Sequence, residues 1–178
     1  METIEKTTLT QLLNNEDYAR KVLPFIKESY FDVREERIIF EEISKFTEKY
    51  KKIPTQVSLE LEVGEGKDLT DVEHDKIVQI IKSLNPAKVD FDWLVDTTEK
   101  FCKDKAVYNA ILRSIEIIDG KSQNETKNAI PNILSDALAV SFDQQIGHDY
   151  FVDPDERFDF YHKVEHYHHL IQLHLWSS

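Results

Sequence analysis

The stretch that decides the fold runs from residue 90 to residue 118 and reads DFDWLVDTTEKFCKDKAVYNAILRSIEII. Its apolar residues recur at steps of three and four, which is the spacing of one face of an α-helix. The predicted face carries Phe91, Leu94, Thr98, Phe101, Lys105, Tyr108, Leu112, Ile115 and Ile118, and it is broken by the charge of Lys105. We therefore expect a helix of roughly 30 residues with a heptad-like seam.

A second helix is predicted after a short turn. Gly120 is suited to end the first helix, and Ser122-Gln-Asn-Glu125 has the pattern of a capping box that starts the next one. The second apolar stripe consists of Ile130, Ile133, Leu134, Ala137, Leu138 and Ser141. Two long helices joined in this way form an antiparallel hairpin. Because the pair alone cannot bury both flanks, we expect it to pack on the preceding helices, on another copy of the chain, or on both.

The segment before the hairpin, residues 1–86, predicts a compact multi-helix head. Its helices are inferred from apolar spacing and from residues that start or stop helices. They are two short helices between Leu9 and Ile26 broken at Asn14-Asn15, one from Asp32 to about Lys51, a short one ended by Gly64, and one from Thr70 to Asn85. Asp32-Val-Arg-Glu35 resembles a capping box, and Thr70-Asp-Val-Glu73 is a complete one.

The predicted order is thus a head at 1–86, a hairpin at 87–142, and a hinge with a linker helix at 143–165. The hinge is expected at Gly147, and the linker helix carries Phe158 and Tyr161. Residues 166–178 form an atypical tail that we expect to be disordered. With only 4 Gly and 5 Pro in 178 residues, the chain lacks the turn residues of an all-β fold, so the predicted class is all-α.

Composition limits the partners of the chain. Its 34 acidic residues outnumber its 22 basic ones, giving a formal net charge of -12. Tight nucleic-acid binding depends on cations that release phosphate counterions, so this segment is not expected to bind DNA by itself. The acidity serves solubility or forms a docking face for a basic protein, and both interpretations stay open.

The lone Cys102 suits a reducing compartment, and no apolar run approaches the length of a membrane span. We therefore expect a cytoplasmic protein without membrane contact.

Several segments together resemble one family. They are Trp93-Leu-Val-Asp-Thr-Thr-Glu-Lys-Phe101, Tyr108-Asn-Ala110, Ala129-Ile-Pro-Asn-Ile-Leu134, Ala137-Leu-Ala-Val-Ser-Phe-Asp143 and Gly147-His-Asp149. In sequence and order they look like the N-terminal domain and first linker residues of the DnaB-like replicative DNA helicases of T-even-type tailed bacteriophages. The resemblance covers about residues 5–165.

The resemblance implies a role in DNA replication. Helicases of this family are ring-shaped hexamers that translocate on single-stranded DNA through a C-terminal ATPase domain using ATP and magnesium. Their N-terminal domains form a collar in which the hairpins of neighbouring subunits pair, and the ring engages a primase and a helicase loader. The linker helix, here with Phe158 and Tyr161, would dock on the next subunit.

From the hairpin pattern and the resemblance together, we expect a homo-oligomer, from dimer to hexamer. The predicted interface residues are Trp93, Phe101, Tyr108, Leu112, Ile115, Leu134 and Leu138. The aromatic residues among them are also suited to packing within one subunit, and the pattern leaves that alternative open.

No catalytic, cofactor-binding or metal site is predicted. The phosphate-binding motif of such ATPases is G-x-x-x-x-G-K-[ST], and Gly120-Lys121-Ser122 supplies only its last three letters, with Ile115 where the first glycine belongs. Five of the seven histidines fall in the final 17 residues, and His162 and His166 have a metal-chelating spacing, but the tail offers no fixed third ligand. An ATPase domain of about 200 residues cannot follow residue 165 within this chain, so we expect no helicase activity from it alone.

Two questions stay open at this stage. The resemblance stops after Glu165, where a frameshift, a natural short protein and a truncated fragment all fit the sequence. The alternative function is a free-standing acidic helical adaptor that binds a basic replication or transcription protein, and a metal-dependent enzyme ranks third. The oligomeric state separates the first two functions, since a collar domain self-associates and an adaptor is not expected to.

Overall fold

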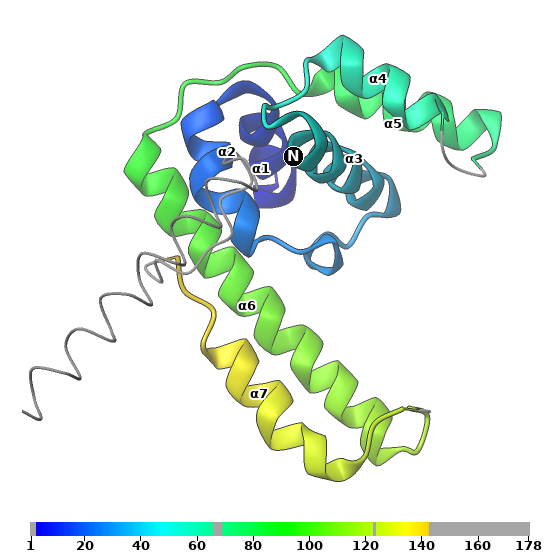
Figure 1. The fold of residues 1–178 in the computed structure, drawn as a ribbon, viewed down its shortest axis with the longest axis vertical. Helices are drawn as coiled ribbons and strands as arrows, with labels where there is room; N and C mark the ends of the chain where they lie inside the picture. Colours follow the sequence, from blue (N-terminus) through cyan, green and yellow to red (C-terminus); the bar gives the residue numbers. More distant parts are fainter. Residues whose placement is uncertain (1–2, 66–68, 123, 143–178) are drawn as a thin grey trace, which may run out of the picture.

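The computed structural model describes residues 3–65, 69–122 and 124–142, and every regular element in these ranges is helical (Figure 1). The α-helices are α1 (Ile4–Asn14), α2 (Glu16–Val22), α3 (Arg34–Tyr50), α4 (Gln56–Glu65), α5 (Asp71–Ser83), α6 (Phe91–Ile118) and α7 (Ile130–Leu138). Three 3-10 turns are η1 (Leu23–Phe25), η2 (Glu28–Tyr30) and η3 (Lys127–Ala129). The predicted all-α class is therefore confirmed for the described residues.

Two predicted segments lie outside the described residues. One is the hinge and linker helix at 143–165, with Phe158 and Tyr161. The other is the tail at 166–178, with most of the histidines.

Helices α1 to α5 form the head, and α6 with α7 forms a hairpin that extends away from it (Figure 1). Within the head, α4 and α5 pack on each other and on α3. They lie at the end of the molecule remote from the hairpin tip (Figure 1). The hairpin is thus the part of the described chain that reaches furthest from the head.

The first two helices meet at Asn15, which serves both. Its backbone N–H donates to the Gln11 carbonyl and ends α1, while its side chain accepts the N–H of Tyr18 at 3.1 Å and starts α2. An asparagine side chain satisfies such an otherwise unpaired helix N–H well. The predicted break at Asn14-Asn15 is confirmed. Leu12 before the break and Tyr18 after it are both buried in the same core.

One hydrophobic core fills the head and continues into the first half of α6. Its fully buried members include Leu9, Leu12, Tyr18, Phe31, Ile39, Ile43, Ile77 and Ile81 from the head and Cys102 from α6. Phe101 of α6 packs edge-on against the rings of Tyr30 and Phe31. The head and the start of α6 therefore share their packing, although they are separate segments of sequence.

The start of α3 differs from the prediction. The capping box expected at Asp32-Val-Arg-Glu35 is wrong, because Val33 occupies the N-cap position and no side chain caps the helix. Asp32 instead accepts a hydrogen bond from Lys105 Nζ at 2.5 Å. Asp32 thus pairs with Lys105, which is 73 positions away in the sequence, and does not cap the start of α3.

The capping box at the start of α5 is confirmed. Thr70 Oγ1 accepts the N–H of Glu73 at 3.3 Å, and the N–H of Thr70 donates to Glu73 Oε2 at 3.0 Å.

Helix α6 begins and ends as the sequence predicts. Asp90 accepts the N–H of Trp93 at its start. At its end Gly120 has a positive φ of 71°, its N–H donates to the Ile117 carbonyl, and the N–H of Lys121 donates to the Glu116 carbonyl. These two bonds make a Schellman motif, which favours glycine because of the left-handed backbone.

The second helix of the hairpin is shorter than predicted. The capping box at Ser122-Gln-Asn-Glu125 is wrong, since the chain forms the 3-10 turn η3 before α7 begins at Ile130. Glu125 instead binds Arg113 of α6 through both guanidinium hydrogen bonds. The hairpin therefore pairs one long helix with one of nine residues.

We predict that a buried hydrogen bond holds α2 to α6. Thr98 donates to the Leu94 carbonyl at 2.8 Å, so the Tyr18 hydroxyl, 2.6 Å from Thr98 Oγ1, must donate to Thr98. Burial raises the pKa of Tyr18 to about 12. Thr98→Val should lower the free energy of unfolding in urea by about 1–3 kcal/mol, because it leaves this donor buried and unpaired.

The matched control is the double variant Tyr18→Phe with Thr98→Val. It removes both partners, so its free energy of unfolding should lie closer to that of the wild type than that of Thr98→Val does. A double variant less stable than Thr98→Val alone would contradict this explanation.

Candidate functional site

The part of α6 beyond the head carries a row of uncovered apolar side chains. Tyr108, Ile111, Ile115 and Ile118, which we call the outer row, are 55%, 47%, 49% and 57% exposed. Their spacing alternates between three and four residues, so they lie on one side of the helix. Leu112, also exposed, borders the row. A run of large apolar side chains on one exposed helix face is typical of a protein interaction surface.

The predicted heptad seam does not form one buried face. Its first part, with Leu94, Thr98 and Phe101, is buried in the head, whereas its last part, with Ile115 and Ile118, is exposed. A straight α-helix drifts by about 20° per heptad from a strict seven-residue repeat, so the seam turns away from any fixed neighbour. In the hairpin the buried side of α6 consists of Ala106, Ala110, Ser114 and Ile117.

The structure places the other predicted interface residues in different surroundings. Trp93 and Leu138 are exposed, and Leu134 is half-buried. Phe101 is buried within one subunit, so its side chain belongs to the core. For the remaining residues, participation in an interface stays a prediction.

Ile111, at the centre of the outer row, is missing from the predicted interface. The signal was present in the sequence, because Tyr108, Ile111, Ile115 and Ile118 keep the three and four spacing as well as the seam does. The seam was drawn through Leu112, about 100° further around the helix. In the structure Ile111 and Leu112 are similarly exposed, at 47% and 44%, so α7 leaves both faces uncovered.

Leu134 and Leu138 extend the uncovered face onto α7. Asn132 and Asp136 of α7 line a groove of about 560 Å³ on the other side of the hairpin, together with Asn109 and Arg113 of α6. Leu138 lies about 200° around α7 from Asp136, so it faces away from that groove. The apolar face of the hairpin therefore includes residues of both helices.

A groove of about 700 Å³ adjoins the outer row where α6 meets the head. Ile4 and Glu5 of α1 line one side, and Phe101, Asp104 and Tyr108 of α6 line the other. Lys105 also lines the groove, and its Nζ lies 2.5 Å from Asp32 Oδ2 and 3.8 Å from Glu5 Oε1. Burial and the neighbouring Glu5 raise the pKa of Glu36, because both disfavour its charged form.

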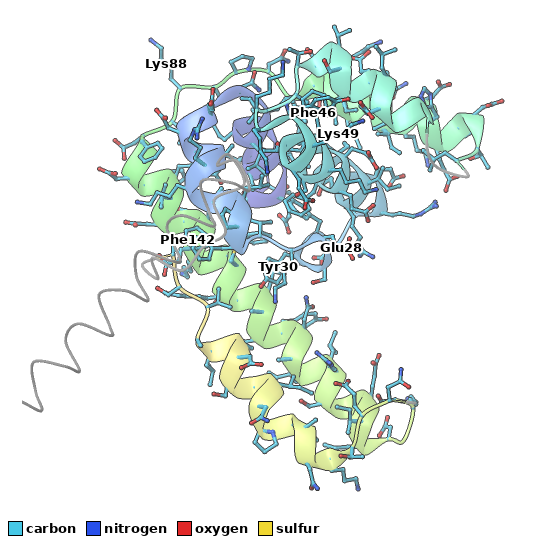
Figure 2. All side chains as sticks on the ribbon, in the orientation of Figure 1. Glu28, Tyr30, Phe46, Lys49, Lys88 and Phe142 are labelled. Atoms are coloured by element: carbon cyan, nitrogen blue, oxygen red, sulfur yellow. The ribbon has the colours of Figure 1, made fainter. Side chains whose placement is uncertain are left out.

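The chain after α7 is fastened to the head by a set of contacts that we call the latch. The carboxylate of Glu99 in α6 accepts hydrogen bonds from Lys103, Ser141 and the backbone of Phe142. The ring of Phe142 stacks on that of Phe25, with centroids 4.8 Å apart. Figure 2 shows Phe142 beside α6, close to the point where the hairpin leaves the head.

Residues 3–65, 69–122 and 124–142 lack two other kinds of functional feature. No group of three or more histidine, cysteine or carboxylate side chains there could hold a metal ion. No helix among the described residues combines the length and the apolar character that crossing a bilayer requires. The uncovered face and its adjoining groove are therefore the strongest candidate site in this part of the chain.

A head with a projecting hairpin and an uncovered apolar face defines an all-helical interaction domain. Residues 1–96 match the family described as DnaB-like helicase N terminal domain. The chain is also 30% identical over 157 residues to the DnaB-like replicative helicase of Enterobacteria phage T4. That alignment covers 84% of this chain and 33% of the phage protein, so the chain spans about a third of that relative's length. The chain belongs to the DnaB-like helicase N-terminal domain family, as its resemblance predicts.

We predict that Glu99 anchors the latch. Glu99→Ala should speed amide hydrogen exchange in residues 130–142, because Ser141 and Phe142 lose their common acceptor. Lys103→Ala is the control, since it removes only the exposed ion pair and should leave this exchange nearly unchanged. Equal effects of the two variants would contradict an anchoring role for the carboxylate.

The latch should also depend on pH. Hydrogen bonding to Lys103 lowers the pKa of Glu99 from its ordinary value of 4.5. A lowered carboxyl pKa gives a contribution that is present above pH 4.5 and is lost as the pH falls through the lowered value. The difference between wild type and Glu99→Ala should therefore shrink below pH 4.5.

Proposed function

We propose that this chain is the assembly part of a phage replicative DNA helicase, and that it self-associates through the hairpin to build the collar of the ring. The observation that carries this proposal is the outer row on a hairpin that projects from the head. Family membership supports it, because the relative from phage T4 is a DnaB-like replicative helicase. On this proposal the protein acts in DNA replication in the cytoplasm of an infected bacterium.

The packing of the hairpin supports self-association. Beyond the head, α6 is covered on one side by the nine residues of α7, and that contact uses small side chains such as Ala110 and Ala137. Scattered exposed apolar residues are normal on a monomer, but a continuous face across two helices is not. Burying apolar surface contributes about 25 cal/mol per Å², so a second hairpin is an economical cover for this face.

The remaining activities of such a helicase are assigned to parts beyond this domain. We propose that ATP hydrolysis with magnesium and contact with single-stranded DNA belong to an ATPase domain of the full-length protein. Primase and the helicase loader are proposed partners of the assembled ring. The excess of acidic over basic residues, 34 against 22, supports a domain that binds proteins rather than DNA.

We predict that one charge in the outer row prevents assembly. Ile115→Asp should weaken the association of two copies by at least about 2 kcal/mol, because each copy would bury an unpaired carboxylate. Light scattering during size-exclusion chromatography should show the wild type at twice the 20.9 kDa subunit mass or more, rising with concentration. The variant should stay near one subunit mass and keep the helical circular dichroism of the wild type, which distinguishes lost assembly from lost folding.

Leu61→Asp is the matched control. Leu61 is 67% exposed on α4 in the head and lies outside the uncovered face of the hairpin, so this variant should assemble as the wild type does. A wild type that keeps one subunit mass at every concentration would overturn the collar proposal and favour the acidic adaptor.

A further inference from the structure

The hairpin has a second groove, on the side away from the outer row. Its volume is about 560 Å³, which is typical of ligand-binding clefts. The segment around η2 forms one wall, and α6 and α7 form the others. The small side chains of Ala106, Ala110 and Ala137 line it where the two helices meet. This part of the groove therefore has room for one large apolar side chain.

One buried group of this groove lacks a partner. Tyr30 lines the groove and is 1% exposed, and its hydroxyl has no hydrogen-bond partner among the described residues. Figure 2 shows Tyr30 beside α6, where the hairpin leaves the head. Burial raises the pKa of Tyr30 to about 12, so its hydroxyl keeps its proton at neutral pH and can donate. Because buried polar groups are nearly always hydrogen-bonded, the groove calls for an occupant with an acceptor oxygen.

The charged residues of the groove favour an acidic occupant. Lys27, next to the head, is exposed, and Arg113 lies further along α6. Arg113 already binds Glu125 through Nε and Nη2, so Lys27 is the cation best placed to pair with an incoming carboxylate. Asp136, on α7, is an acceptor for N–H or O–H groups of the occupant.

The chain itself carries a segment with this chemistry shortly after the groove. Val140 lines the groove, and residues 149–153 read Asp-Tyr-Phe-Val-Asp. These five residues lie outside the described ranges. Their sequence offers a phenylalanine between two carboxylates, and every peptide carbonyl among them is an acceptor. The groove and this segment therefore match in apolar size, in charge and in hydrogen-bonding groups.

The length of chain between them permits the contact. Asp149 follows Phe142 by seven residues, which span up to about 23 Å when extended. From Val140 to Asn132 the groove extends over eight residues of α7, or about 12 Å. A segment tethered this closely has an effective concentration in the millimolar range, so individually weak contacts suffice.

The geometry also favours one direction. Residues 149–153 span about 13 Å when extended, and α6 rises about 10 Å between Ala106 and Arg113. The chain approaches from the head, where the latch holds Phe142. A segment that fills the groove therefore runs along α6 from the head toward the hairpin tip.

We propose that residues 149–153 of this chain occupy the groove between η2, α6 and α7. Phe151 covers the alanines, and Asp149 faces Lys27. A peptide carbonyl of the segment accepts the hydrogen bond of Tyr30.

The contact forms within one chain, on the side of the hairpin away from the outer row. It is therefore compatible with self-association and does not depend on it. Phe158 and Tyr161 lie beyond the docked segment in the sequence, so they stay available for other contacts. The docked segment gives the chain that leaves the hairpin a fixed direction.

Methyl NMR tests the aromatic contact. The ring current of Phe151 should shift the methyl resonances of Ala110 and Ala137, so Phe151→Ala should move both of them. Phe158→Ala is the matched control, because it removes the same ring seven residues further along and should leave both resonances in place. Both variants are made in Ile115→Asp, which is monomeric if the collar proposal holds, as the wild type is if it fails.

Hydrogen exchange tests the direction of the segment. Lys27→Glu and Asp149→Lys should each speed amide exchange in residues 149–153 by about twofold to fivefold, because each places like charges together. The double variant should regain most of the protection. Tyr30→Phe should also speed this exchange, because it removes the donor and keeps the ring. Lys21→Glu, at an exposed position on α2 outside the groove, should leave it nearly unchanged.

Each outcome decides the proposal. Methyl shifts that depend on Phe151 and not on Phe158, with recovery in the double charge variant, support the docked segment. Methyl resonances that do not move, or that move equally in both phenylalanine variants, overturn it. A double variant that exchanges faster than both single variants overturns the pairing of Asp149 with Lys27 and the direction that it assigns. Shifts found in the wild-type background and absent from Ile115→Asp would place the segment of a second copy in the groove, which overturns the contact within one chain.

Discussion

The continuity of α6 is the constraint on which the rest of the structure depends. Its first half fills the core of the head through Leu94, Thr98 and Phe101, and its second half forms the longer wall of the hairpin. Thr98 and Ile111 are thirteen residues apart, or about 20 Å along one unbroken helix. The head therefore sets the direction of the outer row without any separate contact. A domain that presents an assembly surface at a fixed angle needs a rigid element of this kind.

The second helix of the hairpin buries few side chains, since Ala137 is the one buried residue of α7. Helices shorter than about 12 residues are marginal by themselves, and α7 has nine. It is held by small side chains against α6, by the ion pair between Arg113 and Glu125, and by the latch at Glu99 and Phe142. Since binding to the folded state stabilises it, a second copy would strengthen the same hairpin that it contacts. On the proposed function, assembly and local order are thus coupled in this part of the domain.

The sequence predicts the elements of this fold better than their contacts. Asn15, Thr70 and Gly120 act at helix ends as expected, because each acts on backbone groups within a few residues. Asp32 and Glu125 do not, because each finds a cation far away in sequence, Lys105 and Arg113, that a local pattern cannot reveal. Spacing likewise predicts that α6 is amphipathic but leaves two adjacent faces nearly equivalent. That Ile111 is left uncovered as well as Leu112 depends on where α7 packs, which is a long-range property.

The acidity of the chain affects its charged contacts and its apolar contacts differently. A net charge of -12 repels DNA and also repels a second copy of the same chain. At physiological ionic strength this repulsion is screened over about 8 Å, whereas apolar contact needs no counterions and is not lost to screening. On the proposed function, the outer row can therefore supply the strength of pairing despite this repulsion. On the proposed function, the same acidity keeps the DNA strand away from the collar and leaves it to basic surfaces elsewhere in the ring.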